Sequence, residues 1–405
     1  MKTILATAYA INPYKGSEDG MGWNFVLQIA RFNRVIVVTR ENNQATIEKF
    51  MQENPAEIYQ NIQFLYFDLP YWMRFWKKGA RGAMLYYWMW QKGIIGFIKR
   101  QKLEFDVAHN LNFHNDWTPS YLWKLQKPFV WGPVGHHSPI PKEYLKPYSF
   151  KYQIEEKAKW WIKQLFWRFS DALQNTIQKA SHIICMNSKV AYHLNLQNNY
   201  SVIPSVATQD YGKRHQEQQE NFTLISVGRL VPLKGFDLTI QAFSQFVQSL
   251  SKEESQKCNL LIIGSGTEEK LYKKMVQEYG MDKQVQFINW IDRTQLMEIY
   301  KSSSAFLFPS HEGAGMVVAE ALSFGLPVIC LKNEGPGEFI DESCGFAITP
   351  TNYKETVQNL AKSILKIFKD KKIYASASHQ ARNLFETKFH WNIRGEQLQK
   401  IYQSL

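Results

Sequence analysis

Two acidic residues beside a predicted helix start, Glu312 and Glu320, lie about two helical turns apart. The apolar stretch Ala305–Phe308 is typical of a strand, and a glycine-containing turn separates it from a helix predicted over about residues 314–324. Free amides at such a helix start form an anion site for a diphosphate or for sugar hydroxyls. A carboxylate accepts two hydroxyl donors at once, which suits a ribose or hexose diol. The alternative is that Glu312 only balances the helix dipole and that Glu320 is a solvated helix residue.

A second pair of residues, Arg229 and Lys234, flanks a turn that follows the strand-like stretch Phe222–Val227. Two cations at the mouth of a turn suit a diphosphate leaving group, although two ordinary surface cations would give the same pattern. A third strand-to-glycine turn, Gly264–Gly266, is weak evidence for a nucleotide site. It lacks the Lys-Ser/Thr pair of a P-loop, and its glycines do not form G-x-G-x-x-G.

In the first half of the chain, the glycine-containing segment Gly16–Trp23 follows the first predicted strand and opens a helix. Gly20 and Gly22 would let the backbone approach a phosphate and an acceptor, because glycine has no side chain to obstruct them. An ordinary strand-to-helix turn is the alternative for this segment.

Strand-length apolar runs alternate with helical patterns, which predicts an α/β fold with parallel sheets covered on both faces. The alternation restarts after the polar stretch 207–221, which has linker composition. We therefore expect two Rossmann-like, doubly wound domains facing a central cleft, with ligands at the carboxyl ends of the strands. The predicted strands are Thr3–Ala8, Arg34–Thr39, Gln63–Tyr66, Asp106–Ala108, Pro128–Trp131, His182–Met186, Ser201–Ile203, Phe222–Val227, Asn259–Ile263, Val285–Ile288, Ala305–Phe308 and Pro327–Leu331.

The two cations, the glycine turn and above all the pair Glu312 and Glu320 resemble the donor-binding half of retaining glycosyltransferases of family four, which have the GT-B fold of two Rossmann-like domains. This resemblance covers nearly the whole chain. It implies four segments: an acceptor-binding domain over residues 1–206, a linker over 207–221, a nucleotide-sugar-binding domain over 222–386, and a C-terminal helix over 387–405 that crosses back to the first domain.

The resemblance also implies roles for individual residues. Arg229 and Lys234 would bind the donor diphosphate, and Glu320 would bind the nucleoside ribose. Glu312 would contact the donor sugar, and the base would lie near Trp290 and Ile291. The other implied donor contacts are Gly20, Gly22, His109, Gly264, Ala314, Gly315, Met316 and Val317. The implied catalytic residues are His114, Glu312, Arg229 and Lys234.

Two histidine-containing segments of the first half match the family less tightly. The segment His109–His114 has the register of a family segment whose histidine contacts the donor sugar. His114 is the better candidate and His109 the second, although a lone histidine is more often structural. In a loop that resembles G-P-V-G-G-G of some bacterial polysaccharide members, His136 and His137 replace glycines, and we take them as acceptor-binding candidates.

Charge and tryptophan are concentrated in the first half of the chain. Residues 1–205 hold 25 basic and 14 acidic residues, a net charge of +11, whereas residues 206–405 hold a net +1. Eleven of the 13 tryptophans precede residue 170. Residues 71–100 and 151–170 combine aromatic and basic side chains as interfacial helices do, so we expect peripheral contact with anionic membrane. A core-facing helix with snorkelling cations is the alternative.

The four cysteines have no paired spacing, and they lie in or beside apolar stretches. They are typical of reduced core residues of a cytoplasmic protein and not of a disulfide framework or a zinc site. The N-terminal stretch fits a buried strand better than a signal peptide. We therefore expect a cytoplasmic protein with peripheral contact at the inner face of the cytoplasmic membrane.

The residues and the resemblance together lead to one interpretation, in which the resemblance alone implies retention. The chain is expected to be a metal-independent, retaining transferase that moves a sugar from a nucleotide-sugar, here a UDP-sugar, to a glycan or lipid-linked acceptor in bacterial surface polysaccharide biosynthesis. We expect no bound metal, no cofactor besides the nucleotide-sugar co-substrate, and no nucleic acid partner. A sugar-nucleotide epimerase of the same architecture and a basic nucleic-acid-binding protein remain alternatives.

Overall fold

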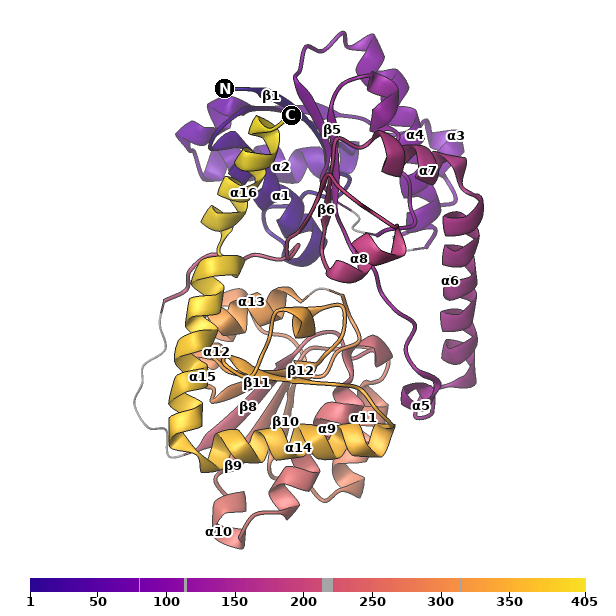
Figure 1. Ribbon diagram of the computed structural model, residues 1–405. Helices are drawn as coiled ribbons and strands as arrows, with labels where there is room; N and C mark the ends of the chain where they lie inside the picture. Colours follow the sequence, from indigo (N-terminus) through magenta and orange to yellow (C-terminus); the bar gives the residue numbers. More distant parts are fainter. Residues whose placement is uncertain (80, 113–114, 213–220, 314) are drawn as a thin grey trace. The chain divides into compact units, whose positions relative to one another are not determined.

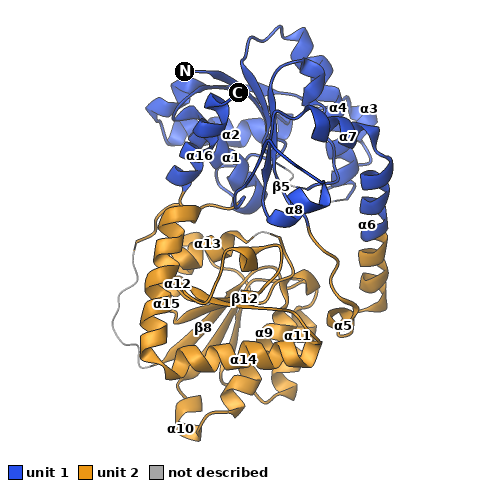
Figure 2. Ribbon diagram, in the orientation of Figure 1, with its two compact units in different colours: residues 1–136, 160–205, 391–405 blue, residues 137–159, 206–390 orange. Residues whose placement is uncertain are grey.

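The computed structural model describes residues 1–79, 81–112, 115–212, 221–313 and 315–405. Its chain forms two compact units (Figures 1 and 2). Unit 1 comprises residues 1–136, 160–205 and 391–405, and unit 2 comprises residues 137–159 and 206–390. These units differ from the expected domain boundaries mainly in residues 137–159, which cluster with unit 2 and not with the N-terminal half. Residues 387–390, expected to belong to the terminal helix, also cluster with unit 2.

Unit 1 is built on a parallel sheet, which among the described residues has seven strands in the order β3-β2-β1-β4-β5-β6-β7. Its central strands are buried along their whole length, as expected where helices cover both faces. The strands are β1 (Thr3–Thr7), β2 (Arg34–Thr39), β3 (Ile62–Tyr66), β4 (Val107–Asn110), β5 (Phe129–Val134), β6 (His182–Cys185) and β7 (Tyr200–Val202). The α-helices are α1 (Ser17–Ala30), α2 (Gln44–Glu53), α3 (Tyr71–Arg74), α4 (Ala83–Arg100), α7 (Asp171–Lys179), α8 (Ser188–His193) and α16 (Trp391–Gln403).

Unit 2 holds a second parallel sheet, with six strands in the described residues in the order β10-β9-β8-β11-β12-β13. Its strands are β8 (Phe222–Val227), β9 (Cys258–Ile263), β10 (Val285–Ile288), β11 (Ala305–Phe308), β12 (Val328–Leu331) and β13 (Gly345–Ile348). Its α-helices are α5 (Lys142–Leu145), α9 (Phe236–Gln248), α10 (Lys252–Ser255), α11 (Glu269–Glu278), α12 (Arg293–Ser302), α13 (Met316–Ser323), α14 (Tyr353–Lys369) and α15 (Lys371–Leu384). The helix α6 (Phe150–Phe169) has its first ten residues in unit 2 and the rest in unit 1.

The predicted α/β class with two Rossmann-like parallel sheets is confirmed. Every predicted strand overlaps an observed one, because a short, largely apolar run between turn and helix patterns is typical of a strand buried in a parallel sheet. The strand β13 was not predicted. Its four residues begin with Gly345, and a run this short carries no periodicity that separates it from a loop.

Residues 137–159 join unit 2 through tyrosines that surround a buried carboxylate. Tyr148 donates a hydrogen bond to Asp237 Oδ1 at 2.6 Å, and Tyr353 donates to Asp237 Oδ2 at 2.8 Å. Asp237 lies in the first turn of α9, and burial raises the pKa of its carboxyl group. Tyr144 adds a hydrogen bond to the carbonyl of Thr351 at 3.0 Å. Because an unpaired buried carboxylate would be costly, these contacts explain why the segment packs with unit 2.

The last helix, α16, packs within unit 1 against the beginning of the chain. Trp391 meets Phe25 edge to face, and Lys2 donates a hydrogen bond to the carbonyl of Tyr402 at 2.7 Å. The side chain of Arg394 is buried in the same unit and donates to the carbonyl of Pro204. The terminal helix is therefore a structural part of the N-terminal sheet domain.

All four cysteines, Cys185, Cys258, Cys330 and Cys344, are buried and free of disulfides. Burial raises the pKa of Cys330 and Cys258, which keeps their thiols protonated at neutral pH. They are core residues, as the sequence indicates. Within the part of the chain that the structure describes, no helix is both long and apolar enough to cross a membrane.

Candidate functional site

A pocket of about 260 Å³ opens in unit 2 where β8, β9 and β10 end. Four of the predicted donor residues line it together: Arg229, Gly264, Trp290 and Ile291. The indole of Trp290 is 81% exposed, so a flat ligand can reach it without displacing protein. The other lining residues are Val227, Gly228, Ile263, Ser265, Asn289 and Leu296. The pocket thus combines an apolar wall, an aromatic surface and one exposed guanidinium.

Glycines at strand ends allow the loops around this pocket to touch backbone to backbone. Gly264 has a φ of +138°, and a Cβ atom there would lie 1.9 Å from the carbonyl oxygen of Gly228. Gly235, in the left-handed conformation before α9, would place a Cβ 2.1 Å from the carbonyl oxygen of Pro309. Any side chain at either position would push two loops apart. The glycine turn at 264 is therefore required by packing whether or not a nucleotide binds.

The ion pair between Lys234 and Glu312 joins two of these loops. Lys234 Nζ lies 2.5 Å from Glu312 Oε2, and both side chains are mostly buried. The lysine comes from the loop after β8 and the glutamate from the loop after β11, two strands that are neighbours in the sheet. The chain leaves β8 and β11 toward opposite sides of the sheet, so this is the topological switch point where ligands bind in such folds.

The second carboxylate, Glu320, is buried in α13 and bonded to an arginine that was not predicted. Only 2% of Glu320 is exposed, which excludes the alternative of a solvated helix residue. Burial raises the pKa of Glu320, and the guanidinium of Arg293 opposes that rise. Arg293 Nη2 donates to Glu320 Oε1 at 2.9 Å, and Arg293 Nε donates to the hydroxyl of Tyr211 at 2.9 Å.

A helix start could have drawn attention to Arg293. Asp292 caps α12 by accepting a hydrogen bond from the amide of Gln295, so Asp292 and Arg293 mark the first turn after β10. The sequence alone gives no reason for Arg293 to meet a residue 27 positions later. The contact follows from the strand order. The helix α12 joins β10 to β11 and α13 joins β11 to β12, so both connections cross the sheet in the same direction and both helices cover the same face.

The start of α13 lies next to these carboxylates. Gly315 is its N-cap residue, and Met316 and Val317 begin the helix. The first amides of a helix have no partner within it, so those of Met316 and Val317 can donate to an anion or a hydroxyl. Ala314, another predicted donor contact, lies outside the described residues.

In unit 1 the two predicted glycines of the first helix do not face open space. Gly20 and Gly22 lie inside α1. A Cβ atom at Gly20 would lie 2.3 Å from the carbonyl oxygen of Lys15, and a Cβ atom at Gly22 would lie 2.1 Å from the carbonyl oxygen of Ala10. Their missing side chains therefore admit the chain's own loop, and packing alone requires glycine at both positions. The approach of a phosphate or an acceptor to their backbone stays a prediction. The side-chain amide of Asn112 also lies beside Gly22, and it donates to the carbonyl of Ala10 at 2.6 Å.

The predicted histidine His109 is fully buried in β4, and both its ring nitrogens have protein partners. Nε2 lies 2.7 Å from the carbonyl oxygen of Gly132, and Nδ1 lies 2.5 Å from the hydroxyl of Tyr402. A carbonyl only accepts, so Nε2 carries the proton and Tyr402 donates to Nδ1. His109 thus ties α16 to the sheet, which corrects its assignment as a donor contact. His114, the preferred candidate, lies outside the described residues.

The two acceptor candidates differ in their surroundings. His136, at the end of β5, is buried, and its Nδ1 lies 2.8 Å from Asp116 Oδ2. His137 is half-buried and is the first residue of the segment that clusters with unit 2. His136 and His137 are neighbours in the loop motif, but the first is buried in unit 1 and the second is half-buried and clusters with unit 2.

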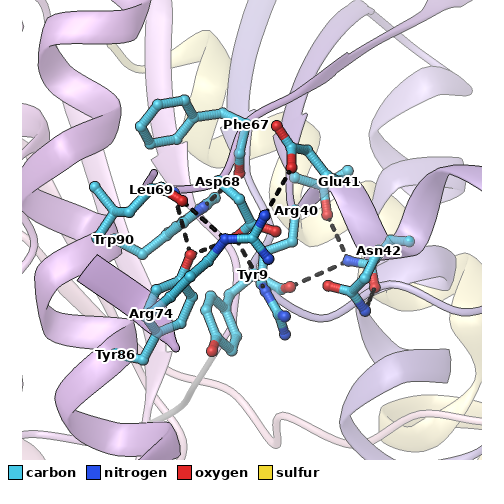
Figure 3. A network of polar contacts seen from close by, with 12 residues as sticks. Tyr9, Arg40, Glu41, Asn42, Phe67, Asp68, Leu69, Arg74, Tyr86 and Trp90 are labelled. Carbon is cyan, nitrogen blue, oxygen red and sulfur yellow. Dashed lines mark hydrogen bonds and ion pairs between the residues drawn. The ribbon is translucent and has the colours of Figure 1, made fainter. Parts of the chain in front are cut away.

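A network of polar contacts in unit 1 includes three residues of the basic, aromatic segment 71–100, namely Arg74, Tyr86 and Trp90 (Figure 3). Tyr86 donates to Asp68 Oδ1 at 2.5 Å, and Arg74 donates to the carbonyl of Leu69 at 2.8 Å. Trp90 is fully buried and also belongs to this network. The main face of α4 is therefore core, which favours the snorkelling alternative for this helix. Exposed large apolar side chains of the segment remain at Tyr71, Trp72, Phe75 and Leu85.

The second basic, aromatic segment behaves differently. The structure describes every residue of α6, and none of them is buried. Its exposed apolar side chains recur at helical spacing and form one stripe, which we call the α6 stripe. The α6 stripe consists of Phe150, Ile154, Trp161, Ile162, Leu165 and Phe169.

Comparison with known proteins bears chiefly on unit 2. Residues 208–384 match the sequence model of the family described as "Glycosyl transferases group 1". An uncharacterized glycosyltransferase of Haemophilus influenzae is 35% identical over 145 residues, which are 35% of this chain and 39% of that protein. A GDP-mannose-dependent monoacylated alpha-(1-6)-phosphatidylinositol monomannoside mannosyltransferase of Corynebacterium glutamicum is 27% identical over 184 residues, 44% of this chain and 45% of the relative. The chain thus matches less than half the length of these curated relatives.

A solved structure resembles the whole chain. The crystal structure of Anabaena HepE in complex with UDP and glucose has a TM-score of 0.63 to this chain at 17% identity, and the alignment covers 100% of both chains. At this identity the likeness shows the fold, which is that of a GT-B glycosyltransferase.

The half-buried histidine next to Glu312, His311, predicts how unit 2 responds to acid. Burial lowers the pKa of His311 to about 4, whereas the unfolded chain has a value near 6.5. The unfolded state therefore binds the extra proton first, and stability falls as pH drops from about 6.5 toward 4. At pH 5 the loss should be about 2 kcal/mol relative to pH 7.5. Urea unfolding at both pH values measures it, and His311→Asn should show a smaller pH dependence than His379→Asn on the exposed surface of α15. Equal pH dependence in the two variants would contradict the assignment.

Proposed function

We propose that this chain is a retaining glycosyltransferase that moves a sugar from a nucleotide-sugar, in our proposal a UDP-sugar, to a glycan or lipid-linked acceptor in bacterial surface polysaccharide biosynthesis. One observation carries the proposal. In unit 2, a pocket holding Arg229 and Trp290, the pair Lys234 and Glu312, and the buried Glu320 all lie at the carboxyl edge of one sheet. The family match over residues 208–384 covers these residues.

The chemistry of each group suits one part of a nucleotide-sugar. A base can stack on the exposed indole of Trp290 against the apolar wall of the pocket. The carboxylate of Glu320 can accept two ribose hydroxyls. Arg229, Lys234 and the first amides of α13 can donate to the diphosphate. Glu312 remains for a hydroxyl of the donor sugar.

The charge arrangement supports a mechanism in which protein groups stabilise the leaving group. When the bond between the sugar and the diphosphate breaks, the electron pair stays on the phosphate oxygen, and negative charge grows there. In this proposal Arg229 and Lys234 neutralise that charge. The acceptor hydroxyl forms the new bond on the face that the diphosphate leaves, and its proton passes to the departing phosphate oxygen. Since the cations belong to the chain, we propose that the transfer step is metal-independent.

We propose that a bound donor replaces the ion pair between Lys234 and Glu312 with contacts to the ligand. Without a ligand, each charge satisfies the other at 2.5 Å. A diphosphate offers the lysine a doubly charged partner, which releases the carboxylate to accept a sugar hydroxyl. In the same way, a ribose diol would share Glu320 with Arg293. Both carboxylates are thus held in place before the donor arrives.

An assay with defined products tests the proposed function. The purified chain is incubated with UDP- and GDP-sugars, with and without glycan and lipid-linked acceptors, and the products are separated by mass spectrometry. Transfer of the sugar from a UDP-sugar with retained anomeric configuration supports the proposal. Conversion of the nucleotide-sugar without any acceptor would identify an epimerase, and transfer only from GDP-sugars would correct the base.

Nucleotide affinity should depend on Glu320. Glu320→Ala should weaken UDP binding by about 1–3 kcal/mol, because the ribose hydroxyls lose their acceptor inside a buried site. Isothermal titration calorimetry measures the change, with Glu342→Ala, an exposed glutamate after β12, as the matched control. Unchanged affinity in Glu320→Ala would remove this residue from the donor site.

Turnover should depend on Arg229 and Lys234 more than on other cations. Arg229→Ala and Lys234→Ala should each lower kcat at least about tenfold, because diphosphate charge grows as the bond breaks. Steady-state kinetics with Lys270→Ala as the control measures this, and added Mg²⁺ should leave the wild-type rate unchanged. Full activity in both variants would refute the leaving-group assignment.

We also propose that the α6 stripe lies on anionic membrane at the inner face of the cytoplasmic membrane, where a lipid-linked acceptor would be found. The expected membrane contact of residues 151–170 is supported by two features of α6: its apolar stripe is exposed, and lysines and arginines border that stripe. Aromatic burial at headgroup level and roughly 1 kcal/mol per cation supply the attraction. The corresponding expectation for residues 71–100 now rests only on the residues of that segment that stay exposed.

Charge reversal should separate membrane contact from donor binding. The triple variant Lys151→Glu, Lys157→Glu and Arg168→Glu should cosediment with anionic liposomes at least about tenfold less than the wild type, because three attractions become repulsions. Its affinity for UDP should not change. The control reverses three exposed lysines of unit 2, Lys354, Lys362 and Lys371. If the wild type fails to sediment at low salt, or both triple variants lose binding equally, the α6 stripe is not the docking surface.

A further inference from the structure

Outside the donor site, two histidines and an aspartate converge at the carboxyl edge of the sheet in unit 1. Asp116 follows β4, His136 follows β5 and His193 ends α8, which follows β6. One ligand atom from each side chain lies within 4.8 Å of the other two. The three strands are neighbours in the sheet, so the fold assembles the cluster from segments far apart in sequence.

Contacts around the cluster fix the positions of its members. The amide of Asp116 donates to the carbonyl of Gly135 at 3.2 Å, and the indole of Trp167 donates to the carbonyl of Asp116 at 3.2 Å. Asn187 donates to the carbonyl of His136 at 3.1 Å. The ring of Trp167 also lies against both imidazoles, with centroids 5.5 Å from that of His136 and 4.1 Å from that of His193. Such surrounding bonds are what orients the ligands of metal sites.

The charges of the cluster favour a cation. Asp116 and His136 are buried, and their side chains are 2.8 Å apart. A second imidazole, that of His193, packs against the first with ring centroids 4.6 Å apart. Because one ligand atom of each side chain lies within 4.8 Å of the other two, a single divalent ion can bind both imidazoles and balance the buried carboxylate.

We propose that Asp116, His136 and His193 form a binding site for Zn²⁺. Two imidazole nitrogens and one carboxylate oxygen are a borderline ligand set that suits Zn²⁺, unlike the all-oxygen sets of Mg²⁺ and Ca²⁺. Three protein ligands leave a fourth position, and the exposure of His193 gives the ion a path from solvent.

The bound ion would link α8 to the loops after β4 and β5. This site belongs to unit 1 and shares no residue with the diphosphate-binding groups of unit 2, so the proposal stands independently of the transfer mechanism. It departs from the expectation of no metal, which considered cysteine spacing and leaving-group chemistry only. It also gives His136, first taken as an acceptor contact, a different role.

Metal binding to the full chain, purified without a histidine tag and stripped with a chelator, tests the proposal. Titration with Zn²⁺ alone should show one ion per chain, and Co²⁺ should give the visible absorption of a bound ion. His193→Ala should weaken Zn²⁺ binding at least about tenfold, the size of effect that metal-site mutations produce. His379→Ala, which removes an exposed histidine of unit 2, should bind Zn²⁺ as the wild type does. Asp116→Asn should weaken binding similarly, with circular dichroism to confirm that it folds.

The outcomes separate this inference from the proposed function. No Zn²⁺ binding at micromolar concentration, or equal affinity in His193→Ala and the wild type, would overturn the site and leave a pair of hydrogen-bonded residues stacked on Trp167. UDP affinity measured on the same samples reports on unit 2. Zn²⁺ binding without UDP binding would keep the metal site and reject the donor site, and the opposite result would do the reverse.

Discussion

Parallel strand pairing is the constraint on which the candidate sites depend. Each sheet is wholly parallel in the described residues, so all the carboxyl ends of its strands lie along one edge. In unit 2 the loops that leave this edge hold Arg229 after β8, Gly264 after β9, Trp290 after β10 and Glu312 after β11. Lys234 and Glu312, 78 positions apart, become neighbours because their strands do. The same geometry in unit 1 assembles Asp116, His136 and His193.

Within that frame, charge pairing decides which side chains can stay buried. Lys234 holds Glu312, and Arg293 holds Glu320, so neither carboxylate bears the full cost of leaving water. Such pairs suit a binding site because a ligand can replace one partner without leaving the other charge unsatisfied. Asp237 shows the structural use of the same principle. Its tyrosine partners are not displaceable, and they attach residues 137–159 to unit 2.

The two basic, aromatic segments show what composition cannot decide. Both combine tryptophans with lysines and arginines, and both suit either a membrane surface or a core. In α4, Tyr86 and Trp90 enter the core of unit 1 and join its polar network. In α6, Trp161 and Phe169 stay in solvent. The difference lies in what packs against each helix, and that depends on the tertiary structure.

The sequence by itself determined the α/β class, the places of nearly all the strands, and the acidic and basic residues at the carboxyl edge of the sheet in unit 2. These features are local, because strand-length apolar runs and the residue types at strand ends can be recognised without knowing what they touch. Only the tertiary structure decided which side chains contact one another. It brought Arg293 to Glu320, used Gly20, Gly22 and His109 for internal packing, and placed His193 beside His136. Those contacts join segments whose separation in the chain gives no periodic signal, so they follow from strand order and not from local pattern.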